Sequence, residues 1–332
     1  MASIKRILSL LLLAAIAAAV AVALWAHLPL TRSDGAPISF EIKAGSSVRG
    51  SARQIAAAGV PVNPTLLALL ARLSRTASHI KAGTYELKPG TTPIELLAQL
   101  VHGEVAQEAV AIIEGWTFDQ MRAAVDANPD IRHDTLGMSD AALLAQIDPA
   151  YHAAEGLFFP DTYMFAKGTS DLQIYKEAHE LMLRHLNEEW AKRAPGLPYK
   201  TPYDALIMAS IIEKETGQTA ERGRIAAVFI NRLKQGMLLQ TDPTVIYGMG
   251  KNFHGNIRKN DLSADTPYNT YVHPGLPPTP IALPGMQSLL AALNPVSSDA
   301  LYFVSRGDGT TEFSASLADH NRAVNKYQRE QR

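Results

Sequence analysis

Apolar residues dominate the start of the chain, where an uncharged stretch from Ile7 to Ala26 follows two basic residues. Roughly 20 apolar residues are enough to cross a bilayer as a helix, and this stretch has that length. Basic residues on its amino side predict a cytoplasmic N-terminus, and Trp25 stands where an interfacial aromatic residue belongs. We therefore predict a cytoplasmic tail at residues 1–6 and a transmembrane helix at residues 7–26.

A cleaved signal peptide is the alternative for this segment, because Ala21-Val22-Ala23 resembles a cleavage site. The apolar core of a signal peptide is usually shorter than the stretch found here, so we favour the anchor. Under either interpretation the rest of the chain is exported from the cytoplasm.

The next part of the chain, residues 38–105, alternates between short strand and helix patterns after a linker at residues 27–37. Apolar and polar residues alternate at 38–43 and again at 83–88, which predicts two strands. Helical patterns fill residues 48–58, 64–73 and 92–101. Strand, two helices and strand is the order of a small LysM-like saccharide-binding module, although many small α/β units share that order.

Residues 106–332 are richer in helical patterns. A short apolar strand at 105–113 is followed by predicted helices at 118–127, 139–147, 171–193, 202–217, 220–234 and 288–293, and by a hairpin at 301–314. The stretch 238–284 is rich in Pro, Gly, Asn and Tyr, a composition that suits the wall of an active site. The predicted fold class is therefore α+β: a transmembrane helix, a small α/β module, and a mixed α/β domain rich in helices.

One carboxylate stands out in the predicted helix at 202–217. Glu213 follows an almost uninterrupted apolar run, and burial would raise its pKa and make it a proton donor near neutral pH. The alternative is an ordinary glutamate at a helix end that reaches water or pairs with Lys214 or Arg222. Glu215 lies about 200° further round the helix, so it cannot face the same pocket. We expect Lys214 and Glu215 to begin a solvated end.

Composition removes several classes of function. The net charge is −1 with no long run of one sign, so binding of nucleic acid has no electrostatic support. The chain has no cysteine, which excludes disulfides, zinc–thiolate sites and a thiol nucleophile. The 10 histidines form no His-x-x-x-His pair on a helix, and there is no phosphate-binding glycine-rich loop. We expect no cofactor and no metal.

Several motifs occur together in a specific order. They are Glu155-Gly-Leu-Phe-Phe-Pro-Asp-Thr-Tyr163, Ala209-Ser-Ile-Ile-Glu213-Lys-Glu-Thr216, Val228-Phe-Ile-Asn-Arg-Leu233, Leu239-Gln-Thr-Asp-Pro-Thr-Val-Ile-Tyr-Gly248, Tyr268-Asn-Thr-Tyr271 and Gly275-Leu-Pro-Pro278. From residue 38 to the end, the chain resembles the endolytic murein transglycosylases, the MltG or YceG-like family. The resemblance implies a single-pass protein of the cell inner membrane with a periplasmic LysM-like module (38–105) and a periplasmic catalytic domain (106–332).

The resemblance also implies a reaction. The glycan strands of peptidoglycan are cleaved between MurNAc and GlcNAc without water, which leaves 1,6-anhydro-MurNAc ends. The single catalytic glutamate of the family falls on Glu213, acting first as acid and then as base. Glycoside hydrolases normally need two carboxylates. Here the C6 hydroxyl of the sugar is the nucleophile, and proximity makes a second carboxylate unnecessary. Termination or trimming of nascent strands is the role that we expect.

Seven further residues are candidates for contact with the saccharide: Glu155, Phe159, Tyr163, Gln240, Tyr247, Tyr268 and Asn269. Phe159 and Tyr163 would stack on sugar faces, but the family often carries tryptophan in that stretch where this chain has Leu157 and Phe158. The alternative there is a packed turn in which Asp161 caps the backbone. Tyr268 and Asn269 would hold N-acetyl groups or support Glu213. Asp242 is expected to cap the short helix through Tyr247.

Two other functions remain open on the sequence. One is a muramidase-type hydrolase that uses Glu213 with Glu155 or Asp161. The other is a non-catalytic peptidoglycan-binding scaffold for cell wall synthases. Glycan strands, the inner membrane and possible cell wall synthases are the partners that we expect, and nucleic acid is not.

Overall fold

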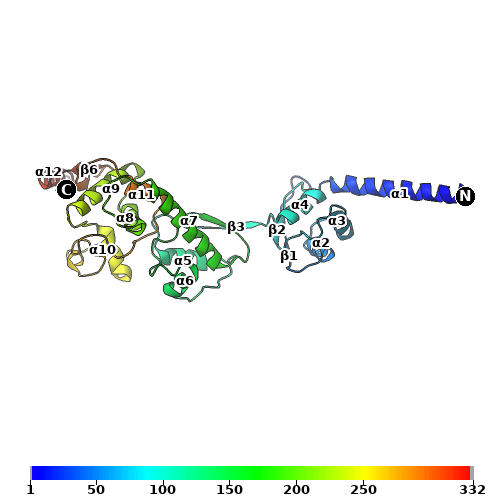
Figure 1. The fold of residues 1–332 in the computed structure, drawn as a ribbon, viewed down its shortest axis with the longest axis horizontal. Helices are drawn as coiled ribbons and strands as arrows, with labels where there is room; N and C mark the ends of the chain where they lie inside the picture. Colours follow the sequence, from blue (N-terminus) through cyan, green and yellow to red (C-terminus); the bar gives the residue numbers. More distant parts are fainter. Residues whose placement is uncertain (1, 330–332) are drawn as a thin grey trace. The chain divides into compact units, whose positions relative to one another are not determined.

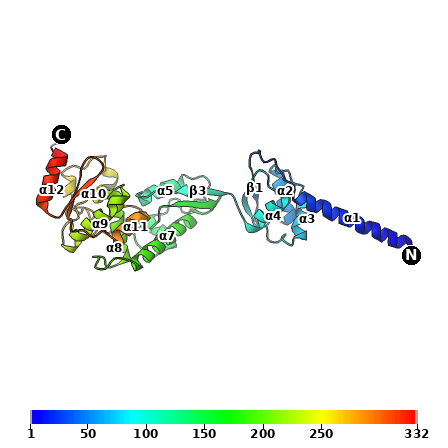
Figure 2. The same ribbon diagram turned by 90° about the horizontal axis from the view of Figure 1, so that it is seen from above.

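The computed structural model describes residues 2–329 and divides the chain into two compact units (Figures 1 and 2). The first unit is Met1–Glu108 together with Met164–Gly168, and the second is Ala109–Tyr163 together with Thr169–Arg332. Helices and three small two-stranded sheets make up both units. The predicted mixture of helices and small sheets is confirmed.

The first unit begins with α1 (Ala2–Ala26), which contains one stretch long and apolar enough to cross a membrane, Ser9–Ala26. It continues with β1 (Ile38–Ile42), α2 (Val48–Ala57), α3 (Pro64–Leu73), β2 (Gly83–Leu87) and α4 (Pro93–His102). β1 and β2 pair antiparallel, with Phe40 opposite Tyr85. The two strands and three short helices enclose a core of apolar side chains that includes Phe40, Ile55, Leu67, Tyr85, Leu96 and Leu100.

Local sequence explains where these helices begin and end. The hydroxyl of Ser47 accepts a hydrogen bond from Gly50 N, and the Asn63 side chain accepts from Thr65 N, so each satisfies a free N–H group of a first turn. Thr92 and Glu95 form a capping box at the start of α4. Gly103 ends α4 with a φ of 78°, a conformation that glycine adopts without strain.

The second unit is mainly helical. Its elements are β3 (Gln107–Ala111), α5 (Phe118–Asp126), α6 (Asp140–Ile147), β4 (Thr162–Ala166), α7 (Asp171–Ala191), α8 (Pro202–Glu215), α9 (Thr219–Lys234), α10 (Asp242–Met249), α11 (Met286–Leu293), β5 (Tyr302–Ser305), β6 (Thr311–Ser314) and α12 (Leu317–Val324). β3 pairs with β4, and both strands run from one unit into the other. β5 and β6 form the predicted antiparallel hairpin. β4 and α12 were not predicted.

Helix α8 is the centre of the second unit. Thr201 and Asp204 form a capping box at its start, and Pro202 occupies the first turn. Every residue from Ala205 to Ile212 is buried, because the helix is apolar on all sides and is surrounded by α7, α9, α10 and α11. The last turn of α8, which carries two glutamates, is therefore held rigidly by its neighbours.

Candidate active site

Glu213 forms an ion pair on the last turn of α8. Its side chain is 5% exposed, and one carboxylate oxygen lies 2.9 Å from Nη2 of Arg222 on α9. The other oxygen accepts a hydrogen bond from the backbone N–H of Gly285, at 3.0 Å. Arg222 and Gly285 therefore each donate to one oxygen of the carboxylate. Of the alternatives open on the sequence, pairing with Arg222 is the arrangement found.

Further contacts surround this ion pair. Burial and the nearby Glu213 raise the pKa of Glu114, while Arg222 opposes that rise. Lys214 Nζ donates a hydrogen bond to the carbonyl of Gly115, at 3.1 Å. These contacts tie the turn that follows β3 to α8, α9 and the start of α11. The contacts around Glu213 are therefore those of an ion pair that stabilises the fold.

Glu215 is the second glutamate of the same turn, and the prediction that it begins a solvated end was wrong. Its side chain is half-buried and accepts a hydrogen bond of 2.6 Å from the hydroxyl of Thr241. Burial raises the pKa of Glu215. The helix geometry was correct, since the two glutamates face apart. The error was to assume that the other side of α8 meets solvent, because the segment at Leu239–Asp242 covers it.

A cleft of about 530 Å³ opens on the Glu215 side of α8. Its walls come from the end of α8, α9, the segment before α10, the β5–β6 hairpin and α12, and its polar lining includes Glu215, Arg232, Gln240, Thr241, Asp242 and Tyr271. Glu213 is not among the lining residues. A desolvated acid that lines a cleft is the arrangement expected of a group that transfers protons.

Three buried threonines fix the hydroxyl that contacts Glu215. Thr241 N donates to Thr270 Oγ1 at 3.1 Å, and Thr244 Oγ1 donates to the carbonyl of Thr241 at 2.8 Å. Thr244 and Thr270 also share a hydrogen bond of 2.9 Å between their hydroxyls. The position of the Glu215 carboxylate is therefore set by a network of groups that are almost inaccessible to solvent.

Gln240 has an unusual backbone next to this network. Its φ is 51°, in the left-handed region that residues other than glycine seldom adopt. Its N–H donates to the carbonyl of Thr270, at 3.0 Å, and its side chain is exposed in the cleft. Backbone strain of this kind is often found where a side chain must point at a ligand. Gln240 therefore keeps its place as a candidate contact.

Tyr271 and Arg232 shape the rest of the cleft. The hydroxyl of Tyr271 donates to Asp242 at 2.6 Å, and burial followed by this hydrogen bond raises the pKa of Tyr271. Asp242 therefore does not cap α10 as predicted; Thr241 is the residue that precedes the helix. Arg232 is 8% exposed and donates to the carbonyls of Leu301 and Leu239. Arg232 thereby joins the hairpin to the segment that carries Thr241.

Three of the predicted contact residues form a second group. Glu155 is 7% exposed and accepts hydrogen bonds from Phe118 N at 3.0 Å and from the hydroxyl of Tyr247 at 3.1 Å. The rings of Tyr247 and Tyr268 pack edge to face with centroids 4.8 Å apart. Burial raises the pKa of Glu155 to about 7. These three residues lie together, but none of them lines the cleft beside Glu215.

The raised pKa of Glu155 predicts how stability changes with pH. An unfolded glutamate has a pKa of about 4.3, so the folded state keeps a proton that the unfolded state releases. The free energy of unfolding contributed by Glu155 therefore falls as pH rises from about 4 to about 7. We expect Glu155→Gln, a neutral isostere, to remove this fall and to be more stable than wild type above pH 7, by at most about 4 kcal/mol. Denaturant titrations across this range measure the difference, and parallel pH curves for the two proteins would contradict it.

Phe159, Tyr163 and Asn269 are placed differently from what we predicted. Phe159 is 8% exposed and its ring packs on His185, while the buried Tyr163 donates its hydroxyl hydrogen to the carbonyl of Phe159. Neither ring has a free face for a sugar, so the packed-turn alternative describes them. Asn269 is fully buried, and its amide contacts the carbonyls of Asp261, Leu262 and Ala264. Asn269 therefore holds a loop closed.

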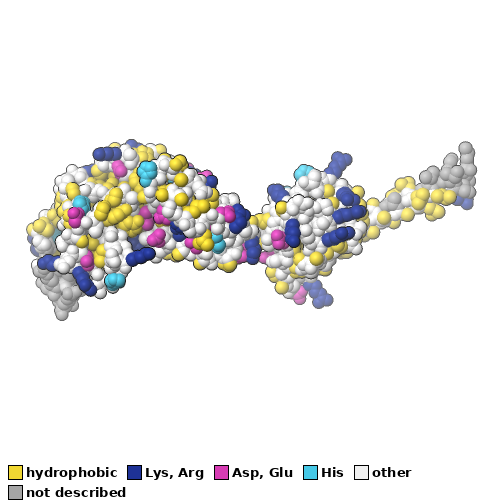
Figure 3. All heavy atoms as spheres, turned by 90° about the horizontal axis from the view of Figure 1, so that it is seen from below, with side chains coloured by type: hydrophobic (Ala, Val, Ile, Leu, Met, Phe, Trp, Pro, Cys, Tyr) yellow, Lys and Arg dark blue, Asp and Glu magenta, His cyan; other side chains and the backbone are white. Residues whose placement is uncertain are grey.

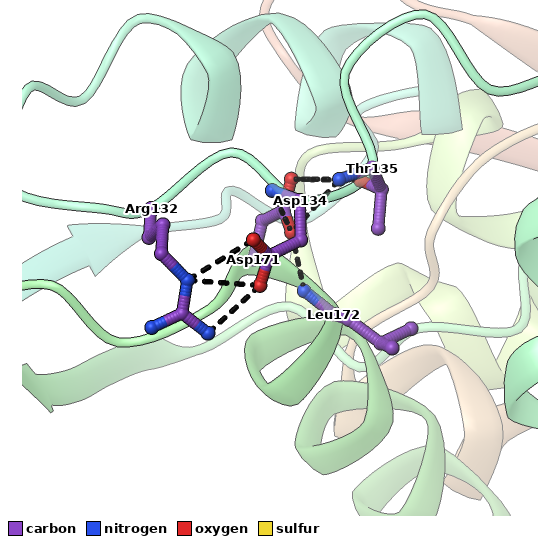
Figure 4. A network of polar contacts seen from close by, with 5 residues as sticks. All are labelled: Arg132, Asp134, Thr135, Asp171 and Leu172. Atoms are coloured by element: carbon purple, nitrogen blue, oxygen red, sulfur yellow. Dashed lines mark hydrogen bonds and ion pairs between the residues drawn. The ribbon is translucent and has the colours of Figure 1, made fainter.

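One group of side chains has the composition of a metal site. The ligand atoms of Asp126, His133 and Asp171 lie within 4.8 Å of one another. Figure 4 shows, however, that the Asp171 carboxylate accepts hydrogen bonds from the N–H groups of Thr135 and Leu172. It also accepts from Asp134 N and from the Thr135 hydroxyl. Because these bonds occupy its lone pairs, we assign no metal to this group.

Comparison with known proteins gives consistent matches over most of the chain. Residues 40–326 match the model of the YceG-like family. A Bacillus subtilis protein named endolytic murein transglycosylase is 31% identical over 318 residues, which cover 90% of this chain and 87% of that protein. A Streptococcus pneumoniae protein of the same name is 27% identical, and the match covers 90% of this chain but only 59% of that longer protein.

A solved structure also matches. The crystal structure of a yceG-like protein from Listeria monocytogenes has 32% sequence identity and a TM-score of 0.55. The match covers 86% of this chain and 98% of the Listeria chain.

Glu215 and Tyr271 are two of the cleft residues that the sequence analysis did not propose as site residues. Both stand inside motifs that were quoted for other residues, Glu215 two places after Glu213 and Tyr271 three places after Tyr268. The motif at 239–248 could have pointed to Glu215, because Thr241 in that motif donates a hydrogen bond to the Glu215 carboxylate.

Proposed function

Because this chain belongs to the YceG-like family, we propose that it is an endolytic peptidoglycan transglycosylase. It would cleave glycan strands between MurNAc and GlcNAc without water and leave 1,6-anhydro-MurNAc ends. The relatives that carry the name endolytic murein transglycosylase support the class of reaction. The site described above supports an acid–base mechanism that needs no cofactor.

We propose Glu215 as one candidate for the general acid, and we keep Glu213, on which the family resemblance places the catalytic glutamate, as the other; the variants Glu215→Gln and Glu213→Gln distinguish them. Glu215 is the glutamate of the α8 end that lines the cleft, and its burial favours the protonated form. Glu213 instead contacts the guanidinium of Arg222 and the backbone N–H of Gly285, and it does not line this cleft. A proton donor must hold its proton at working pH, so the setting of Glu215 suits the task better.

The proposed reaction is balanced with one carboxyl group. Glu215 donates its proton to the bridging oxygen as the bond from that oxygen to the anomeric carbon breaks. The C6 hydroxyl of the same sugar attacks the anomeric carbon, and the Glu215 carboxylate accepts the hydroxyl proton. The acid is restored and no water is consumed. Thr241 holds the carboxylate in place through its hydroxyl during both transfers.

The contacts proposed for the saccharide follow the lining of the cleft. Gln240 has an exposed amide, and Tyr271 offers a ring held by Asp242, so both can contact a sugar beside Glu215. Glu155, Tyr247 and Tyr268 form a separate polar and aromatic group, which we keep as a second candidate contact. Phe159, Tyr163 and Asn269 are not proposed as contacts, because Phe159 packs on His185, Tyr163 bonds to the carbonyl of Phe159, and Asn269 bonds to loop carbonyls.

The proposed topology is a single-pass protein of the inner membrane. Residues 1–6 would lie in the cytoplasm, 7–26 would span the membrane, and 27–37 would connect to a LysM-like module at 38–105 and a periplasmic catalytic domain at 106–332. An apolar helix at the N-terminus supports the anchor. An anchored enzyme works close to the site of strand synthesis, which fits termination or trimming of nascent strands with cell wall synthases as partners.

Analysis of the products tests the reaction directly. We expect the full chain in detergent to convert purified glycan strands into shorter strands that end in anhydro-MurNAc, with internal cuts from the first time points. Mass spectrometry distinguishes these ends from hydrolysed ends by the mass of one water. Ordinary reducing ends would contradict the transglycosylase and favour a hydrolase, for which Glu221 and Asp242 are the further carboxylates that line the cleft.

The hydrolase pairs suggested by the sequence are less well placed. Neither Glu213, Glu155 nor Asp161 lines the cleft beside Glu215. Binding of strands without any cleavage would instead favour the scaffold. A scaffold, however, gives no reason for a desolvated acid at the wall of a cleft.

A further inference from the structure

The apolar helix α1 joins the first unit without a free spacer. Its candidate span ends at Ala26, which is buried, and Trp25 packs against the core of the unit. The chain that follows stays attached, because Leu30 N donates to the carbonyl of Thr91 and Gly90 N donates to the hydroxyl of Thr31. If α1 spans a bilayer, the body of this unit starts at the lipid headgroups.

Four of the large apolar side chains exposed in this unit beyond α1 lie just after α1 or on helices that contact it, and another, Met164 (50% exposed), lies on β4. Among the described residues from 27 to 108 the four are Leu28 (61% exposed), Leu69 (40%), Leu73 (67%) and Ile94 (40%). Leu28 follows α1 directly, and the other three lie on α3 and α4, the helices of the unit that contact α1. Figures 1 and 2 both draw α3 beside the end of α1. These four exposed residues therefore lie either just after α1 or on the two helices that contact it.

Helix α3 carries apolar residues on the side that faces the core of the unit and also on its outer side. Leu67, Ala68 and Ala71 are buried in the core of the unit. Leu66, Leu69, Leu70 and Leu73 follow one another on the outer side at helical spacing and are half-buried or exposed. A helix that is apolar all round normally has all its sides covered. The outer leucines of α3 therefore need an apolar partner.

Basic side chains stand around the same end of the unit. Arg32, Arg72 and Arg75 are exposed, and Figure 3 shows several Lys and Arg side chains on the first unit near the end of α1. Surfaces that lie on anionic lipid combine exposed leucine with arginine. The apolar side chains enter the boundary between headgroups and acyl chains, and the cations bind the lipid phosphates.

We propose that the leucines of α3, with Leu28 and Ile94, form a membrane-contacting face that lies on the bilayer in which α1 is embedded. The occupant of this face is the lipid surface itself, with Arg72 and Arg75 at the phosphate groups. The first unit is then held in one orientation on the membrane by a second contact besides the anchor. The proposal rests on the membrane anchor proposed above, but not on the reaction.

The absence of cysteine allows single-cysteine reporters in the full chain. We would attach a nitroxide label at Leu73→Cys, at Leu11→Cys in the span, and at Glu41→Cys on β1 as an exposed control. The proteins would be reconstituted in vesicles that contain phosphatidylglycerol. Relaxation by oxygen, which concentrates in lipid, is compared with relaxation by a water-soluble nickel complex. We expect an oxygen-to-nickel ratio several-fold higher at positions 11 and 73 than at position 41.

Leu69→Glu in the Leu73→Cys protein is the matched test of the face. A charge one turn away should lift the label from the lipid and lower its ratio towards that of position 41. A ratio at position 73 equal to that at position 41, with position 11 in lipid, would overturn the docking and leave the anchor intact. A water-exposed label at position 11 would overturn the anchor and the docking with it. The cleavage assay is unaffected by either result.

Discussion

Replacing Glu215 with Gln is expected to abolish the release of anhydro-MurNAc ends, whereas replacing Glu213 with Gln is expected to leave release measurable. The two substitutions are the same chemical change, made two residues apart on one helix. Glu215→Gln removes the only proton of that side chain that can be donated to the bridging oxygen, and loss of a general acid and base costs about 10²- to 10⁴-fold in rate. Glu213→Gln removes a charge outside the cleft.

The measurement is the initial rate of anhydro-end formation on purified strands, with circular dichroism of each variant to show that it is folded. Binding of strands by the Glu215→Gln protein shows that the cleft is intact. A folded Glu213→Gln protein with no activity, beside an active Glu215→Gln protein, would restore Glu213 as the acid. Thr241→Val is a useful third variant, because it removes the hydrogen bond to Glu215 and leaves the carboxyl group in place.

The local structure of α8 could be predicted from the sequence, but the surroundings of its last turn could not. The cap at Thr201 and the apolar interior depend only on residues close in sequence. The environment of each glutamate depends on residues distant in sequence. Gly285 reaches Glu213, and Thr241 reaches Glu215, so which of the two lines a cleft is decided by tertiary packing.

The aromatic residues illustrate the same limit. An aromatic side chain in a motif can stack on a sugar or fill a core, and burial is the only difference between these outcomes. Tyr163 follows Pro160 closely and packs inside the unit, while Tyr271 follows Asn269 and lines the cleft. The spacing of apolar residues and the composition are similar in the segments around Tyr163 and Tyr271. The choice depends on α7 in the first case and on the segment before α10 in the second.

The geometry also suggests why two glutamates stand so close together at this helix end. Glu213 binds the start of α11 and pairs with α9, so it fixes the end of α8 against two neighbours. Glu215 needs that fixed end in order to meet Thr241 and the cleft. One carboxylate would then position the helix, and the other would react. Under this division, replacing Glu213 would lower the stability of the fold, and replacing Glu215 would lower the rate of the reaction.

Breaking the ion pair by Arg222→Met is expected to destabilise the second unit by about 3–5 kcal/mol, because it leaves the buried Glu213 without its cation. The neighbouring Glu114 adds to the effect, since Arg222 also offsets the repulsion between the two carboxylates. Urea unfolding followed by tryptophan fluorescence measures the change. Two of the three tryptophans, Trp116 and Trp190, belong to the second unit and report on it.

The double variant Arg222→Met with Glu213→Leu separates the ion pair from simple loss of packing. Replacing both members of a buried pair by apolar residues is often neutral, so we expect the double variant to recover most of the stability that Arg222→Met loses. Glu213→Leu alone leaves the guanidinium unpaired and should again be costly. If Arg222→Met unfolds at the urea concentration of the wild type, the pair is not structural, and the case for Glu213 as the reacting carboxylate becomes stronger. Recovery in the double variant, together with retained cleavage, would instead show that the charge of Glu213 acts on stability and not on the reaction.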